Sequence, residues 1–182
     1  MPPDSFYGFP QVSPMRVLLS EQTPSGVSSV EFKSIPNMYI RLILEMAVRS
    51  SQAATAVYGY IELNGDATDA NYQYAETYTY GGGTVGGNGG AIRMLTTGIC
   101  GANAPANSFT IGKIEIPFYT SAIGKQVLYR GAHRRDASSI YNINYTSVCY
   151  WNNVAIVNAI KILLQAGNYV TNTIFRLYGE SI

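Results

Sequence analysis

The amino-acid sequence predicts an all-β protein, a two-sheet antiparallel sandwich preceded by an extended N-terminal arm. Three observations support this fold class. The chain is rich in residues that favour strands and turns, with 15 Tyr and 18 Gly among 182 residues. Short runs alternate apolar with polar residues, and turn residues separate these runs. The length predicts one domain, which we place at residues 15–182.

Residues 1–14 are predicted to form the arm, because prolines at positions 2, 3, 10 and 14 oppose both helix and central strand. Phe6, Tyr7 and Phe9 lie between these prolines. Their burial would be favourable, so the arm is expected either to dock on a neighbouring subunit or partner, or to fold back on its own domain. The sequence favours neither.

The first strands are expected at residues 15–19, 27–32, 39–49 and 57–63. The clearest is 39–49, where apolar residues at even positions alternate with Arg41, Glu45 and Arg49 at odd ones. Residues 50–55 are predicted to form a loop. A turn is predicted at Asn64-Gly65-Asp66, whose residue types tolerate positive φ.

A ladder of tyrosines lies on one face of the next predicted strand, 72–80: Tyr72, Tyr74, Tyr78 and Tyr80. Tyrosine supplies rigid amphipathic contact area, so this face is a candidate assembly surface. Cross-strand packing within one sheet is an equal alternative. The following glycine tract, 81–90, is predicted to be a flexible loop.

Later strands are expected at residues 91–97, 108–119, 125–130, 142–151, 159–165 and 173–179. Residues 155–164 also carry a broad apolar stripe at helical spacing, but a strand after a turn at Asn152-Asn153 is preferred. The number of strands favours a two-sheet sandwich.

The charge distribution argues against a nucleic-acid partner, since the net charge is +1 and only 13% of residues are charged. Little charge repulsion separates copies, so an oligomer or a larger assembly is expected. The start of the chain lacks the pattern of a signal peptide, and no run approaches the ~18 apolar residues of a membrane span. We expect synthesis in the cytosol and no membrane partner.

Catalysis is not expected. The one histidine, His133, has no G-x-S-x-G nucleophile motif to serve and is interpreted as a polar loop residue. Asp66 and Asp69 lack the spacing of a calcium loop, and the glycine tract lacks a following Gly-Lys-Ser/Thr. No cofactor or metal is therefore implied. Cys100 and Cys149 are expected to be buried thiols, with a disulfide between them as the alternative.

A cluster of arginines, Arg130, Arg134 and Arg135, is the remaining candidate site. Guanidinium groups bind carboxylates in a bidentate manner, so the cluster could contact an acidic partner or close a subunit interface. A solvated loop is the preferred interpretation.

The order of several short motifs resembles a family of tailed-phage virion proteins. The motifs are Ser34-Ile35-Pro36 followed by Tyr39, then Arg49, Leu63-Asn64-Gly65-Asp66, Asn71-Tyr72 and Leu177-Tyr178-Gly179. The resemblance spans about residue 27 to residue 179. It implies a domain similar to jelly-roll capsid decoration (cement) proteins, or to terminal domains of tail fibres, and it carries no catalytic residues.

The resemblance and the absence of a fibre-like repeat favour a decoration protein. Such a protein is expected to bind the major capsid protein at the capsid surface, as a homotrimer, and to stabilise the shell. The alternative is a tail-fibre or tail-tip domain that recognises host surface glycans through the aromatic faces of tyrosines such as Tyr58, Tyr60, Tyr72 and Tyr74.

Overall fold

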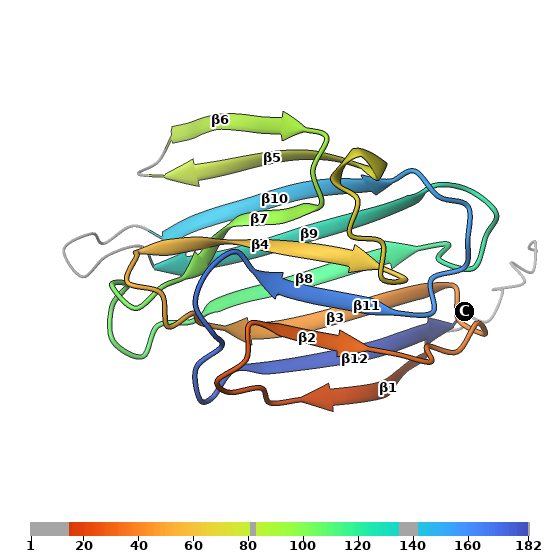
Figure 1. Cartoon of the computed structure of the whole chain (residues 1–182), viewed down its shortest axis with the longest axis horizontal. Helices are drawn as coiled ribbons and strands as arrows, with labels where there is room; N and C mark the ends of the chain where they lie inside the picture. Colours follow the sequence, from red (N-terminus) through yellow and green to blue (C-terminus); the bar gives the residue numbers. More distant parts are fainter. Residues whose placement is uncertain (1–14, 81–82, 135–141, 182) are drawn as a thin grey trace, which may run out of the picture.

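The computed structural model describes residues 15–80, 83–134 and 142–181 (Figure 1). In it the chain forms two antiparallel β-sheets packed face to face, which confirms the predicted all-β sandwich. The described helical structure is one short 3-10 turn, η1 (Asp69–Asn71). No helix in these residues is long and apolar enough to cross a membrane.

Twelve strands lie in the described residues. They are β1 (Met15–Gln22), β2 (Ser29–Phe32), β3 (Arg41–Val48), β4 (Ala56–Leu63), β5 (Tyr72–Tyr80), β6 (Gly83–Gly90), β7 (Met94–Cys100), β8 (Thr110–Pro117), β9 (Lys125–Arg134), β10 (Asn142–Trp151), β11 (Ile160–Leu164) and β12 (Ile174–Ser181). Strand β11 settles the choice between helix and strand near residue 160 in favour of the strand.

The strand order is that of a jelly roll with two insertions. One sheet has the order β1-β12-β3-β8-β9-β10-β5-β6, and the other has the order β2-β11-β4-β7. The groups β1-β12-β3-β8 and β2-β11-β4-β7 are the two facing sheets of an eight-stranded jelly roll. Two hairpins, β5-β6 and β9-β10, widen the first sheet. Strand β7 of the second sheet packs against β9 and β10 of the first.

The core lies between the sheets, on the faces that the alternation predicts. In β3, Leu42, Leu44 and Met46 are buried, whereas Arg41 and Glu45 point to the outer face. The period-two pattern arises because successive side chains of a strand point to opposite faces of its sheet. One apolar cluster joins both sheets.

Tyrosine rings in this core pack against glycines on neighbouring strands. A Cβ at Gly112 would lie 2.7 Å from the ring carbon Cε2 of Tyr129, and a Cβ at Gly98 would overlap the ring of Tyr145. Gly179 lies in the same way against Tyr39. The large content of Tyr and Gly therefore reflects an interior in which rings lie directly on bare backbone.

The predicted turn after β4 is present and is fixed by one carboxylate. Asn64 and Gly65 adopt positive φ of 53° and 75°. The Asp66 carboxylate accepts hydrogen bonds from the Asn71 amide at 2.8 Å, the Thr68 backbone N–H at 3.0 Å and the buried Trp151 indole at 2.8 Å. Burial raises the pKa of Asp66, but these hydrogen bonds, led by that of Trp151, outweigh it and leave the pKa below its ordinary value.

At the opposite end of the sandwich Arg49 holds the β7–β8 loop. Its guanidinium donates to four backbone carbonyls of that loop, those of Ala102, Ala104, Pro105 and Ser108, at 2.7–3.0 Å. Because a planar guanidinium presents several donors in a fixed geometry, one side chain satisfies carbonyls that would otherwise lack partners.

Two expectations from the sequence need correction, and a third is confirmed. The glycine tract was expected to be a loop, but its residues 83–90 form strand β6, because their backbone pairs with β5. His133 is not a loop residue: it lies near the end of β9, is 3% exposed and stacks on Tyr145 with ring centroids 5.4 Å apart. Cys100 and Cys149 are buried free thiols, as expected, and the disulfide alternative is absent.

Candidate interaction surfaces

The predicted assembly residues fall into three groups in the structure. Phe6, Tyr7, Phe9 and Arg135 lie outside the described residues. The tyrosines of the ladder lie on the inner face of β5. Arg130 and Arg134 lie exposed on the outer face of β9.

The inner placement of the ladder corrects the expectation that Tyr72 and Tyr74 present surface for assembly. Both are buried in the core, and the Tyr72 ring stacks on Trp151 with centroids 6.3 Å apart. Burial raises the pKa of the Tyr72 hydroxyl, which donates to the Asp66 carbonyl at 2.9 Å. Tyr78 and Tyr80 are half-buried and pack against the same core. The ladder was interpreted either as an assembly surface or as packing within the domain, and the second interpretation is correct for Tyr72 and Tyr74.

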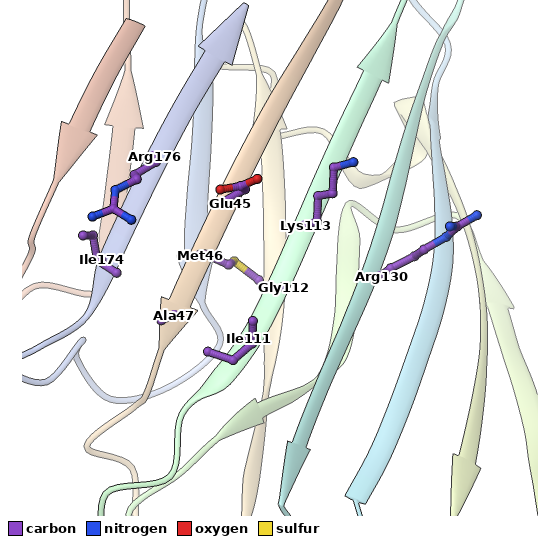
Figure 2. Close-up of a pocket in the computed structure, with 9 residues that line it drawn as sticks. All are labelled: Glu45, Met46, Ala47, Ile111, Gly112, Lys113, Arg130, Ile174 and Arg176. Carbon is purple, nitrogen blue, oxygen red and sulfur yellow. The ribbon is translucent and has the colours of Figure 1, made fainter. Parts of the chain in front are cut away.

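A cleft of about 360 Å³ lies on the outer face of the larger sheet, across β12, β3, β8 and β9 (Figure 2). Two rows of side chains line it. The first row runs Ile174, Ala47, Ile111, which are direct cross-strand neighbours. The short Ala47 side chain between two isoleucines makes the depression, and Met46 and Gly112 also line it.

The second row is charged and runs Arg176, Glu45, Lys113, Arg130 along the same registers. Arg176 pairs with Glu21 at 2.6 Å and Lys113 pairs with Glu115 at 2.7 Å. Glu45 pairs with Arg16 at 2.9 Å. Arg130 makes no ion pair with any residue that the structure describes.

A second surface, the apolar end, lies where three loops meet at one end of the sandwich, on the right in Figure 1. These loops join β2 to β3, β8 to β9 and β10 to β11. Backbone hydrogen bonds tie them together, from Phe118 to Ile40 at 2.9 Å and from Val157 to Tyr119 at 3.0 Å. The apolar end comprises six exposed side chains: Met38, Ile40, Phe118, Ile123, Val154 and Ile156.

The side chains of the apolar end are large and well exposed. Met38 is 73% exposed, Val154 62% and Phe118 61%. The three loops carry no charged residue over 34–40, 118–124 and 152–159. Depletion of charge around exposed apolar groups is typical of the central part of a protein–protein interface.

The apolar end is also held rigidly. Phe118 adopts a left-handed φ of 51°, a conformation that costs a non-glycine residue about 1–3 kcal/mol and must be imposed by its surroundings. Buried Lys125 donates from Nζ to the carbonyls of Ser121 and Ile123 in one loop and of Val154 in another. Burial lowers the pKa of Lys125. The exposed side chains are therefore presented on a fixed frame.

Other polar groups in the interior are used within the fold. Buried Glu76 accepts hydrogen bonds from the Thr96 hydroxyl at 3.0 Å and from the Thr97 hydroxyl at 2.5 Å. Asp69 lies in η1 and pairs with Arg93 at 3.1 Å. Among the described residues no three His, Cys, Asp or Glu side chains gather as a metal site.

No protein-family model, curated protein or solved structure matches the chain. The cleft and the apolar end were not expected from the sequence, although Arg130 was named as a candidate. The sequence gives one indication of the apolar end, which is the absence of charged residues from three turn segments. It does not show that these segments are neighbours in the fold.

Proposed function

We propose that this chain is a non-enzymatic structural protein of a bacteriophage virion, a decoration protein that binds the capsid surface and stabilises the shell. The observation that carries the proposal is the apolar end. Six large apolar side chains on three rigidly held loops without charged residues form a surface whose burial against another protein is favourable. The major capsid protein is the proposed partner, and copies of this chain are proposed to associate as a trimer.

Burial of the apolar end supplies a plausible binding energy. Complete burial of one such side chain contributes about 1.5–3 kcal/mol, and the members of this surface still expose a large part of their area. Several of them together would offset the loss of translational and rotational freedom on association, which is about 4–15 kcal/mol. Repetition of the contact over many copies would then make the shell harder to open.

The fold is compatible with this role. Jelly rolls occur in viral capsid proteins and also in sugar-binding proteins, so the topology alone does not choose between them. The glycan-binding alternative relied on exposed faces of Tyr58, Tyr60, Tyr72 and Tyr74. Because Tyr72 and Tyr74 are buried, that alternative has less support than the decoration role.

The proposal is tested on phage particles that lack this protein, to which purified protein is added back. The wild-type chain is compared with Phe118→Ser and Ile156→Ser at the apolar end. Leu18→Ser, which alters an apolar side chain 51% exposed on β1, is the matched control. We expect wild type and control to coat the heads and raise their heat resistance, and both end variants to bind at least about 10-fold more weakly.

Immunogold labelling of intact particles places the protein, and native mass spectrometry gives its copy number per complex. Label over the whole head agrees with decoration. Label confined to the tail, or unchanged heat resistance of particles without the protein, contradicts it. A monomeric mass at micromolar concentration contradicts the trimer alone.

A further inference from the structure

The cleft on the outer face of the larger sheet contains two cations in direct opposition. Lys113 of β8 and Arg130 of β9 are cross-strand partners, and their side chains share the outer face. Like charges in this position destabilise a sheet unless they are compensated. Glu115 pairs with Lys113 at 2.7 Å; it also interacts electrostatically with Arg130, but no ion pair joins Arg130 to a carboxylate among the described residues.

The position of the Arg130 side chain leaves its guanidinium accessible. In Figure 2 its aliphatic stem starts at the cleft and its guanidinium reaches towards β10. The nearest outward residue of β10 in register is Thr146, which carries no charge. A carboxylate placed at this edge of the cleft could therefore form an ion pair with the Arg130 guanidinium. The Lys113 ammonium on the neighbouring strand would add to the attraction.

The other half of the cleft is apolar. Ile111 is 60% exposed and faces Ile174 across the short Ala47. This gap accepts an apolar side chain, which would cover both isoleucines. The two halves lie side by side, because the apolar row and the charged row are successive outward positions on the same strands.

We propose that this cleft binds an extended segment of a partner protein that carries an apolar side chain close to a carboxylate. Arg130 lies two strands across and two residues along from Ala47, about 12 Å away, which is a span of three or four extended residues. The apolar side chain sits over Ala47 and the carboxylate pairs with Arg130. The partner segment supplies a carboxylate for Arg130, which forms no ion pair with the acids of the described residues.

A protein segment fits this cleft better than a small metabolite. Sites for small molecules enclose most of the ligand surface, whereas this cleft lies on the face of a sheet on which no described element packs. An extended chain gains its affinity from a few anchored side chains and needs no enclosure. The cleft is separate from the apolar end, so the proposal does not depend on the decoration role.

The test uses nine-residue synthetic peptides and the isotope-labelled full chain. One peptide carries two leucines and two aspartates within four residues. A second replaces the aspartates with asparagines, a third replaces the leucines with serines, and sialyllactose is the acidic-sugar probe. Amide chemical shifts in NMR spectra report both the place and the strength of binding. The protein variants are Arg130→Gln, Ala47→Leu, which fills the gap, and Ala75→Leu, an exposed alanine on the outer face of β5, as the matched control.

We expect the leucine–aspartate peptide to shift the amides of Ala47, Ile111 and Arg130 and to bind Ala75→Leu as it binds wild type. Arg130→Gln should weaken binding about 10-fold, and the asparagine peptide should show the same loss on wild type but little further loss on this variant. Ala47→Leu should abolish the shifts while its remaining spectrum stays native. Absence of binding by this peptide, shifts elsewhere on the surface, equal loss in Ala75→Leu, or a response to sialyllactose alone would overturn the proposal.

Discussion

Replacement of Asp66 by alanine is expected to cost the fold about 2–3 kcal/mol. The Asp66 carboxylate receives the indole N–H of Trp151 at 2.8 Å, and Trp151 is almost fully buried. A hydrogen bond to a charged acceptor contributes about 1.5–3 kcal/mol, and a buried donor left without a partner costs a similar amount. The Asn71 amide and Thr68 N–H, the other donors, reach water more easily and add less.

Urea unfolding measures this loss. With a dependence on urea of about 2 kcal/mol per molar, the midpoint should fall by about 1–1.5 M. Trp151 is the only tryptophan, so its fluorescence follows this region, and far-ultraviolet circular dichroism follows the sheets. Asp69→Ala is the matched control in the same turn, because its single ion pair with Arg93 is exposed and worth less than about 1 kcal/mol. Equal midpoints for the two variants would refute the reasoning.

The same carboxylate gives a pH dependence with a definite sign. Because the folded-state pKa of Asp66 lies below its ordinary value, its contribution to stability is complete above the unfolded pKa of about 3.9. That contribution disappears as the pH falls through the lower folded-state pKa. The difference in urea midpoint between wild type and Asp66→Asn should therefore be constant from pH 7 to 5 and shrink as the pH falls below about 4. A difference that persists unchanged at pH 2 would show that the charge does not matter.

Three further predictions follow from the packing. Gly98→Ala should lower the free energy of unfolding by about 1–3 kcal/mol, because the added methyl group would overlap the Tyr145 ring. The loss should be smaller in a Tyr145→Leu background, as measured by thermal unfolding of both single variants and the double variant. Arg49→Met should cost about 2–4 kcal/mol and speed amide exchange in the β7–β8 loop, with Arg49→Lys restoring only part of both. Burial raises the pKa of Cys149 to about 12, so Ellman's reagent should label it and Cys100 at least about 100-fold more slowly in the native protein than in urea. Dithiothreitol should leave the unfolding midpoint unchanged.

Most strands were predictable because one face of each is buried. Burial of a single face imposes a period of two on the sequence, which is why 142–151 was expected and Asn142–Trp151 is observed as β10. The prediction failed at β6, where glycines show no such period. The pairing of β6 rests on backbone hydrogen bonds to β5, which leave little mark in a segment that is mostly glycine.

Errors at the ends and faces of strands also have physical causes. Strand β9 was expected to end at residue 130, because Gly131 and Ala132 interrupt its apolar pattern. The strand in fact continues to Arg134. The tyrosine ladder was placed on the right strand, but tyrosine is amphipathic and does not declare which face it occupies. The polar partners on the other face of β5, Gln73 and Thr77, were the better indicator of the outside.

Neither proposed surface could be assembled from the sequence. The apolar end joins loops that are about 80 and 120 residues apart along the chain, such as those of Met38, Phe118 and Val154. The cleft depends on the register that sets Ala47 between two isoleucines and Lys113 against Arg130. Pairing of this kind depends on the whole topology and is not a local property of any segment.

The packing of tyrosine rings on bare glycine backbone has a consequence for how this protein can diverge. Gly98 and Gly112 have no side chain because the rings of Tyr145 and Tyr129, respectively, occupy the space that a Cβ would need. A side chain gained at the glycine requires a smaller residue in place of the tyrosine. Homologous chains are therefore expected to keep both members of a pair or to replace both. Correlated substitutions at these positions would then identify the contacts of the core even between chains of low sequence identity.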